Sequence, residues 1–391
     1  MRQDEERVDA LHRTGLLDTP PEDRFDRVVR LACRLFDVPT AAVNLVDRDR
    51  QFTKASVGVD LPDRPLSASI CASAIQDPDP LVIEDLTADE RFRDTELVQA
   101  NPGLRFYAGQ PLVASGQRVG TLCVFDERPR SVDDTDLAVL RDLAGWIEKE
   151  MALDEEMVRG GEVQRRLLPR RPPTVEGYDV VGRCLPAREV GGDFYDWFPV
   201  DDEVQVVLGD VMGKGIGSAI IAASVRALVR GASRYNTLGD AVTRTAATLE
   251  DDLEQTTTFV TLFCARLEPS TGRLEYVDAG HGLSFVLDAH GGHRRLESEG
   301  LPLGVLPGSE WKPGEVVLEP GHTLVAVSDG TLDFFPDPAA ALDALVELNR
   351  DCADTDELVV KLTELTARGD RSDDVTMFAV RRHGTGDGVA S

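Results

Sequence analysis

Four aspartates stand where strands are expected to begin or end, with glycine or another acid beside them. They are Asp193 in GGDFYD, Asp210 in GDVMGKG, Asp329 in SDG and Asp373 in DDVT. A carboxylate at such a position loses hydration unless something pairs with it, and carboxylates brought together raise one another's pKa. A divalent cation resolves that conflict, and oxygen ligands of this kind suit Mg²⁺ or Mn²⁺ better than zinc or copper. Each aspartate taken alone is more typical of a turn or a helix cap, so the metal prediction depends on finding four of them in one segment.

The aspartates must be positioned by elements that lie far apart in the sequence. From about residue 175 to 382 the hydrophobic pattern predicts a strand-rich, mixed α/β (α+β) domain. Strands are expected at 178–185, 204–210, 259–268, 273–279, 323–330 and 375–382, and helices at 216–231, 238–254, 338–350 and 356–367. The metal pocket therefore forms only when the chain folds.

The preceding segment predicts a separate domain and a connecting helix. Strands are expected at 41–47, 81–86 and 109–126, the last interrupted by a turn at Ser115-Gly116-Gln117, and helices at about 20–37 and 133–150. Apolar residues continue at helical spacing to Leu168, and Gly160-Gly161 predicts a break or hinge because two adjacent glycines are costly in a helix. We expect this helix to pair with its twin in a homodimer, with a plain linker as the alternative.

Composition excludes some classes of partner. The chain has 391 residues, with 70 acidic against 42 basic residues and a formal charge of −28. Nucleic acid and anionic membrane surfaces would repel it. The first ten residues are charged, and the six cysteines are scattered without a CxxC pair. These features predict a cytoplasmic protein with reduced thiols.

Seven motifs in the third segment resemble the SpoIIE/RsbU-like branch of the metal-dependent type 2C (PPM) serine/threonine phosphatases. In order, they are VQRRLLP (163–169), VGGDFYD (190–196), GDVMGKG (209–215), FVTLFCARLEPSTGRLEYVDAGH (259–281), LPLGV (301–305), SDG (328–330) and DDVT (373–376). The resemblance implies an α/β/β/α sandwich over residues 174–383. It also implies a protein-serine/threonine phosphatase with two Mn²⁺ or Mg²⁺ ions per catalytic domain.

The same resemblance assigns roles to individual residues. Asp210 matches the aspartate that bridges both metals, and the carbonyl of Val211 matches a backbone ligand. Asp193 matches the acidic residue that holds one metal directly or through water, and Asp329 and Asp373 match ligands of the other metal. Asp196 and Asp374 are nearby carboxylates, Arg188 and Lys214 are candidates for binding the phosphate, and His281 in AGHG matches a family position. A water held between two metals would attack phosphorus in line with the leaving seryl or threonyl oxygen.

Residues 1–148 resemble a GAF sensor domain. The matching stretches are LHRTGLLDTP (11–20), VNLVDRDRQF (43–52), SASICASAI (67–75), ERFRDTELV (90–98), RFYAGQPL (105–112) and GTLCVFD (120–126). The ligand of this domain stays open. Cys71 and Cys123 are either buried structural thiols or residues that attach a chromophore or sense redox state.

The arrangement of the two domains implies regulation through the linker at 149–173. In similar proteins the input domain and connecting helix control the phosphatase, which makes Gln164, Leu167 and Leu168 the expected switch residues. The expected substrate is a phosphorylated anti-sigma-factor antagonist with a STAS fold. The alternatives are a pseudophosphatase that senses a ligand and holds a partner, and a second-messenger cyclase, which would not explain GDVMGKG. Residues 384–391 are expected to form a disordered tail.

Overall fold

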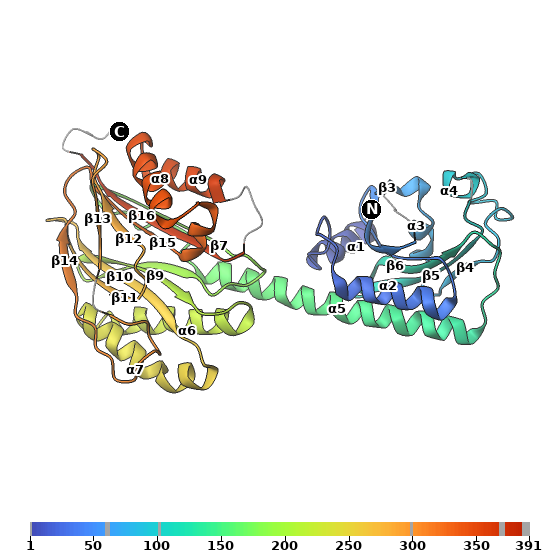
Figure 1. The fold of residues 1–391 in the computed structure, drawn as a ribbon, viewed down its shortest axis with the longest axis horizontal. Coiled ribbons are helices and arrows are strands. Elements are labelled where there is room, and N and C mark those ends of the chain that lie inside the picture. The colour runs from blue at the N-terminus through green and yellow to red at the C-terminus, as the bar shows by residue number, and fades with distance from the viewer. Residues whose placement is uncertain (1, 59–62, 101–102, 298–299, 367–371, 385–391) are drawn as a thin grey trace. The chain divides into compact units, whose positions relative to one another are not determined.

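The computed structural model describes the chain except residues 1, 59–62, 101–102, 298–299, 367–371 and 385–391 (Figure 1). It divides into two compact units, Met1–Arg159 and Gly160–Ser391. Residues 385–391 of the expected tail lie outside the described residues. No helix in the described part of the chain is both long and apolar enough to cross a membrane.

The first unit is built on a six-stranded antiparallel sheet with strand order β3-β2-β1-β6-β5-β4. The strands are β1 (Thr40–Val46), β2 (Arg50–Val57), β3 (Arg64–Pro65), β4 (Leu81–Ile83), β5 (Phe106–Ala114) and β6 (Gln117–Asp126). Strands β5 and β6 form a hairpin in which Ser115 and Gly116 both have positive φ, 46° and 76°. Positive φ at both positions gives the turn the twist that hairpins favour, so the predicted turn is confirmed.

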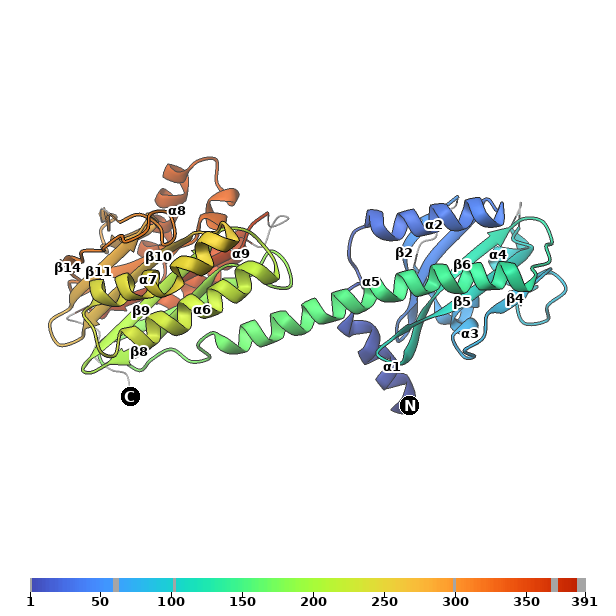
Figure 2. The same cartoon turned by 90° about the horizontal axis from the view of Figure 1, so that it is seen from below.

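Helices cover both faces of this sheet. They are α1 (Arg2–Arg13), α2 (Asp23–Phe36), α3 (Ile70–Ala74), α4 (Glu96–Gln99) and α5 (Asp134–Leu167), with a 3₁₀ turn at Leu66–Ala68. Phe25 of α2 and Ile147 of α5 belong to one buried cluster against the sheet, and Figure 2 shows these two helices side by side. Helix α3 packs in a second cluster with Tyr107 and Phe125 on the opposite face.

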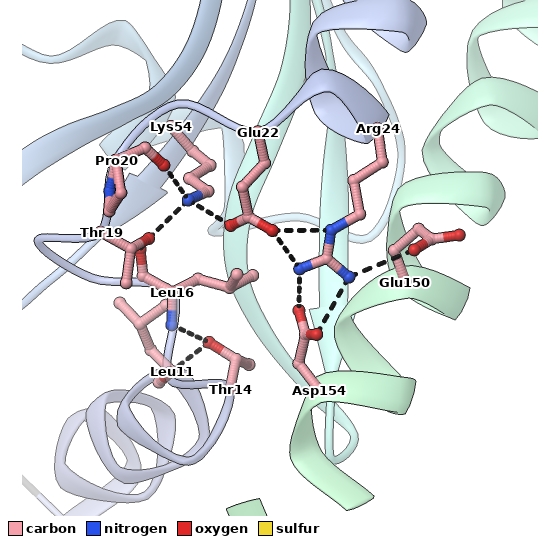
Figure 3. A network of polar contacts seen from close by, with 10 residues as sticks. All are labelled: Leu11, Thr14, Leu16, Thr19, Pro20, Glu22, Arg24, Lys54, Glu150 and Asp154. Carbon is pink, nitrogen blue, oxygen red and sulfur yellow. Dashed lines mark hydrogen bonds and ion pairs between the residues drawn. The ribbon is translucent and has the colours of Figure 1, made fainter. Parts of the chain in front are cut away.

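A charged network fastens α5 to α2 within the first unit (Figure 3). The Arg24 guanidinium donates to both carboxylate oxygens of Asp154, at 2.9 and 2.8 Å, and to Glu150 and Glu22. Glu22 also pairs with the ammonium of Lys54, whose side chain is fully buried. Since a buried ammonium must be paired to be tolerated, this network constrains where the first half of α5 lies.

The second unit contains two five-stranded antiparallel sheets, ordered β14-β11-β10-β9-β8 and β13-β12-β15-β16-β7. Its strands are β7 (Tyr178–Leu185), β8 (Phe194–Val200), β9 (Glu203–Val211), β10 (Val260–Glu268), β11 (Arg273–Ala279), β12 (Ser284–Leu287), β13 (His293–Arg295), β14 (Gly314–Val317), β15 (Thr323–Val327) and β16 (Val375–Arg382). Its helices are α6 (Ile216–Ala232), α7 (Leu238–Thr256), η2 (Asp329–Phe334), α8 (Pro338–Asp351) and α9 (Thr355–Thr366).

These elements form four layers. Phe263 and Phe378 belong to the core between the two sheets. Helices α6 and α7 pack on the outer face of the first sheet, and α8 and α9 cover the second, as Figure 1 shows. The α/β/β/α sandwich predicted for this part of the chain is confirmed.

The expected break in the connecting helix is absent, because α5 is continuous through both glycines. A Cβ atom added at Gly161 would come closer than 3.0 Å to the carbonyl oxygen of Glu189, whereas one at Gly160 would lie 3.5 Å from Val190 Cγ1. Glycine at position 161 therefore permits a close approach between the helix and the segment that precedes β8. The prediction of a break was wrong, and Gly161 allows close packing in a continuous helix.

Candidate active site

The two sheets bring the four predicted aspartates to one end of the sandwich. Asp193 precedes β8 and Asp210 lies in β9, and these two strands are paired. Asp329 begins η2 directly after β15, and Asp373 precedes β16, the partner of β15 in the other sheet. The cluster therefore takes two carboxylates from each sheet.

The carboxylates of the cluster lie close enough to raise one another's pKa. Burial, followed by the charges of Asp329 and Asp373, raises the pKa of Asp210 to about 7. Burial also raises the pKa of Asp193 well above its usual value, with further contributions from the charges of Asp210 and Asp374. The fold thus places ionised groups where they destabilise one another, as happens at sites that hold a cation or share a proton.

Asp374 positions the backbone that leads to Asp193. Its Oδ1 accepts a hydrogen bond from the Ala187 amide at 2.8 Å, and its Oδ2 accepts one from the Gly192 amide at 2.7 Å. A Cβ atom on Gly191 would collide with this carboxylate. Both carboxylate oxygens of Asp374 therefore hold the backbone of the 187–193 segment in place.

The backbone carbonyl of Val211 also lies at this end of the sandwich. A Cβ atom on Gly192 would lie 2.5 Å from the Val211 oxygen, and the Val211 amide donates to the Gly192 carbonyl at 3.3 Å. Glycine at position 192 therefore leaves the carbonyl uncovered by a side chain. This carbonyl is the predicted backbone ligand.

Lys214 places a positive charge at the edge of the cluster. Its Nζ lies 3.0 Å from Asp373 Oδ2 and donates to the carbonyl of Ser372. Gly213 and Gly215 on either side have φ values of 99° and 91°, which allow the loop to turn there. Asp373 is thus paired with an ammonium in this structure.

The donor set suits a hard divalent cation. Asp193 Oδ2 is buried and makes no hydrogen bond within the described residues. Across the same part of the chain, no group of three or more His, Cys, Asp or Glu side chains is already arranged as a metal site. The carboxylates therefore lie at the same end of the sandwich, but they are not yet arranged around one common point. Their oxygen-only chemistry, the unused Asp193 oxygen and the open Val211 carbonyl fit Mg²⁺ or Mn²⁺.

Two other predicted residues make no hydrogen bond or ion pair with the four aspartates within the described part of the chain. Asp196 is buried on β8, and its Oδ2 lies 3.2 Å from Arg226 Nε and 3.6 Å from Arg230 of α6. Arg188 is exposed, and no hydrogen bond or ion pair is assigned to it among the described residues. Asp196 is therefore engaged by the arginines of α6, and a role of Arg188 in phosphate binding stays a prediction.

The end of α5 contacts the active-site loop through one of the three predicted switch residues. Gln164 Nε2 donates to the Gly191 carbonyl at 2.7 Å, and the Gly191 amide donates to Gln164 Oε1 at 3.1 Å. Leu168 packs against the cores on both faces of the first sheet, whereas Leu167 is 45% exposed. Gln164 is the direct link from α5 to the segment that carries Asp193.

His281, which the resemblance matched to a family position, lies one hydrogen-bond partner away from a strand residue paired with Asp210. Its Nδ1 lies 3.4 Å from Thr261 Oγ1, and Thr261 pairs with Asp210 across β9 and β10. Burial lowers the pKa of His281 to about 4, so the ring is neutral near pH 7. The AGHG motif was the available signal, but the pairing of Thr261 with Asp210 had to come from the fold.

Comparison with known proteins places each part of the chain in a family. The SpoIIE family (Stage II sporulation protein E) matches residues 200–383, and the GAF domain family matches residues 20–151. Phosphoserine phosphatase RsbU of Bacillus subtilis is 24% identical over 243 residues, which are 60% of this chain and 72% of RsbU. Protein IcfG from a Synechocystis strain is 30% identical over 266 residues, 58% of this chain and 42% of IcfG, so the chain spans less than half of that relative.

A solved structure supports the fold of the second unit. The PP2C domain of SiaA from Pseudomonas aeruginosa is 21% identical, with a TM-score of 0.50, and the match covers 59% of this chain and 96% of that domain. Together with the two family matches, these observations identify the chain as a GAF domain followed by a SpoIIE-type PP2C phosphatase domain.

Proposed function

We propose that the protein is a metal-dependent phosphoserine/phosphothreonine protein phosphatase that its GAF domain regulates. The observation that carries the proposal is the cluster of Asp193, Asp210 and Asp329 at strand ends of a SpoIIE-type domain, where desolvation and neighbouring carboxylates raise the pKa of each group. The relative RsbU, which is named a phosphoserine phosphatase, supports the same activity.

The chain's own residues have distinct tasks in this proposal. Asp193, Asp210, Asp329, Asp373 and the Val211 carbonyl would hold two Mn²⁺ or Mg²⁺ ions. When bound, such ions lower the pKa of water and neutralise phosphoryl oxygens. Asp374 holds the backbone before β8 in place, and Lys214 offers a positive charge to the incoming phosphate.

Lys214 also sets a condition for metal binding. Its ammonium occupies Asp373, so a cation that takes this carboxylate must displace the ion pair. The side chain of Lys214 is about one-third exposed, and such a pair is worth only up to about 1 kcal/mol. Divalent cations can therefore displace Lys214 and leave it available to the substrate.

The proposed substrate is a phosphorylated STAS-domain anti-sigma-factor antagonist, on the strength of the resemblance to RsbU. A chain with a net charge of −28 repels phosphoproteins over most of its surface. Lys214 and the arginines at 165, 166, 170 and 171 would supply local attraction. The free cysteines fit a cytoplasmic location.

The proposed homodimer would form along α5. Its exposed apolar side chains are Trp146, Leu153, Val163 and Leu167, between 45% and 58% exposed. Apolar side chains spread along an exposed helix are typical of helix pairing. Gln164 would then transmit a change at the end of the helix to the 187–193 segment.

The test is hydrolysis of p-nitrophenyl phosphate and of a phosphorylated STAS protein by the full chain, with Mn²⁺ or with EDTA. We expect activity that requires Mn²⁺ and falls about 100-fold or more in Asp210→Asn. Asp251→Asn is the matched control, since Asp251 is an exposed aspartate on α7. Activity that survives EDTA and Asp210→Asn contradicts the two-metal proposal. A wild type inactive on both substrates favours a pseudophosphatase that holds a partner.

A further inference from the structure

Two cysteines of the first unit lie in contact inside the protein. Cys71 of α3 and Cys123 of β6 have their Sγ atoms 4.0 Å apart, and the two residues are 2% and 0% exposed. They come from elements separated by 52 positions in the sequence. This is the one sulfur–sulfur contact among the described residues, and it lies on the sheet face opposite α2 and α5.

The sulfurs sit in a polar pocket rather than a purely apolar one. Asn44 Nδ2 donates to both of them, at 3.4 Å to Cys71 and 3.2 Å to Cys123. Thr53 Oγ1 donates to Asn44 Oδ1 at 2.9 Å, which fixes the amide with its NH₂ group toward the sulfurs. The Tyr107 hydroxyl donates to Cys71 Sγ at 3.7 Å. Donors aimed at a buried sulfur favour its thiolate form.

Tyr107 reaches this position because of a glycine. Gly109 pairs with Cys123 across β5 and β6, and a Cβ atom at Gly109 would overlap the Tyr107 hydroxyl. The sheet thus keeps open the space that the hydroxyl fills. Two hydrogen-bond donors, from β1 and from β5, converge on Cys71.

The two thiols differ in their pKa, so they are expected to differ in reactivity. The hydrogen bond from Cys123 lowers the pKa of Cys71 to about 7 against the effect of burial, with smaller contributions from Thr121, Tyr107 and Asn44. Burial raises the pKa of Cys123 well above its usual value. Burial also raises the pKa of Cys33, the other cysteine of this unit. Cys71 is therefore the thiol that reacts first with an oxidant. Cys123 is the neighbouring thiol that can react with the oxidised Cys71.

We propose that Cys71 and Cys123 form a reversible intramolecular disulfide when the protein meets hydrogen peroxide. The Cys71 thiolate attacks one peroxide oxygen, the O–O bond breaks, and the departing hydroxide takes up a proton to leave water and a sulfenic acid. The Cys123 sulfur then attacks the Cys71 sulfur, the S–O bond breaks, and a second water leaves with the Cys123 proton. Two thiols and one peroxide thus give one disulfide and two waters.

The small cavity beside Cys71 limits which oxidants can reach its sulfur. The cavity beside Cys71, lined by Gln51, Arg64 and Leu97 among others, has a volume of about 10 Å³. That is the space of one water-sized molecule, so peroxide fits the route better than a tripeptide disulfide does. The sulfurs must close from 4.0 Å to about 2.05 Å. Because β6 is an interior strand paired with β1 and β5, we expect the five-residue helix α3 to make this movement.

The experiment treats the full chain with hydrogen peroxide, removes the oxidant with catalase, and alkylates the denatured protein with N-ethylmaleimide. We expect the number of alkylated cysteines to fall from six to four, and dithiothreitol to restore six. Tryptic digestion should give one linked pair, peptide 55–91 with peptide 119–130. Six thiols after treatment, or a link between other cysteines, would overturn the proposal.

Two variants sharpen the result. Cys33→Ser, the matched control, should still lose two thiols. Cys123→Ala should instead leave a Cys71 sulfenic acid, which dimedone traps when the treated protein is denatured in its presence. A variant that loses two thiols as the wild type does contradicts the pairing. If Cys123→Ala does not fold, the peptide map of the wild type decides the question alone. None of these measurements depends on phosphatase activity, so this inference and the proposed function fail separately.

Discussion

Gly160 and Gly161 should respond in opposite ways to the same substitution. In Gly160→Ala the new methyl group lies 3.5 Å from Val190 Cγ1, an ordinary contact. Alanine is favoured over glycine in a helix by about 1 kcal/mol, so this variant should be as stable as wild type or more stable. In Gly161→Ala the methyl group meets the rigid carbonyl of Glu189, and the helix and loop must separate by roughly 1 Å or more to reach ordinary contact.

That separation has a cost that the structure lets us estimate. The two hydrogen bonds between Gln164 and Gly191, at 2.7 and 3.1 Å, lie one turn further along α5 and would lengthen or break. At about 1 kcal/mol each, their loss together with overpacking exceeds the gain in helix propensity by about 2 kcal/mol. If the shifted loop displaces Asp193, the same free energy lowers kcat/KM by about 30-fold.

Two measurements check this prediction. Metal-dependent hydrolysis of p-nitrophenyl phosphate gives kcat/KM, and hydrogen exchange of the 187–193 backbone reports whether the loop has loosened. We expect Gly161→Ala to lose activity and protection while Gly160→Ala keeps both. A hinge at these glycines would make both alanine variants stiffer and change them alike, so equal behaviour of the pair would refute the close-packing explanation.

Three further substitutions test the charges around the site. Asp210→Asn removes one of several repelling carboxylates, so it should raise the free energy of unfolding of the metal-free protein by about 1–3 kcal/mol; a lower melting temperature in EDTA would contradict this. Lys214→Met frees Asp373, so half-maximal activity should need up to about five-fold less Mn²⁺, and an unchanged or greater requirement would show that the ion pair does not compete. Burial lowers the pKa of His281 from 6.5 to about 4 in the folded protein, so its contribution to stability is complete above pH 6.5 and disappears as the pH falls toward 4. In His281→Gln the unfolding free energy should fall by about 3 kcal/mol less than in wild type between pH 6.5 and pH 4. An unchanged pH dependence would refute the assigned burial effect.

The strands that the sequence predicted well are those with clear boundaries. Strands β7, β11 and β16 match their expected ranges, and the helices of the second unit begin and end within about two residues of prediction. Strand β8 was missed because FYDWFPV is buried on both faces and shows no alternation. The strand expected to reach residue 330 ends at Val327, since the chain turns into a 3₁₀ helix at Asp329.

The sequence predicted which residue types form the site, but not which contacts each aspartate makes. Strand-end aspartates were recognisable one by one, yet their pairing partners depend on which face each side chain occupies. Asp196 stands three positions after Asp193, and side chains an odd number apart in a strand point to opposite faces. Asp196 therefore turns toward the arginines of α6, away from the cluster. Likewise, only the fold reveals that Asp374 accepts hydrogen bonds from the Ala187 and Gly192 amides.

The position of β16 in its sheet has a consequence for biosynthesis. Strand β16 lies between β7 and β15, although it is the last of the three to leave the ribosome. A nascent chain that stops before it has β7 without its only neighbour, the inner edge of β15 uncovered, and neither Asp373 nor Asp374. Exposed strand edges of this kind invite pairing with other chains. We therefore expect the domain to gain activity only once residue 382 has emerged, and chaperones to protect it until then.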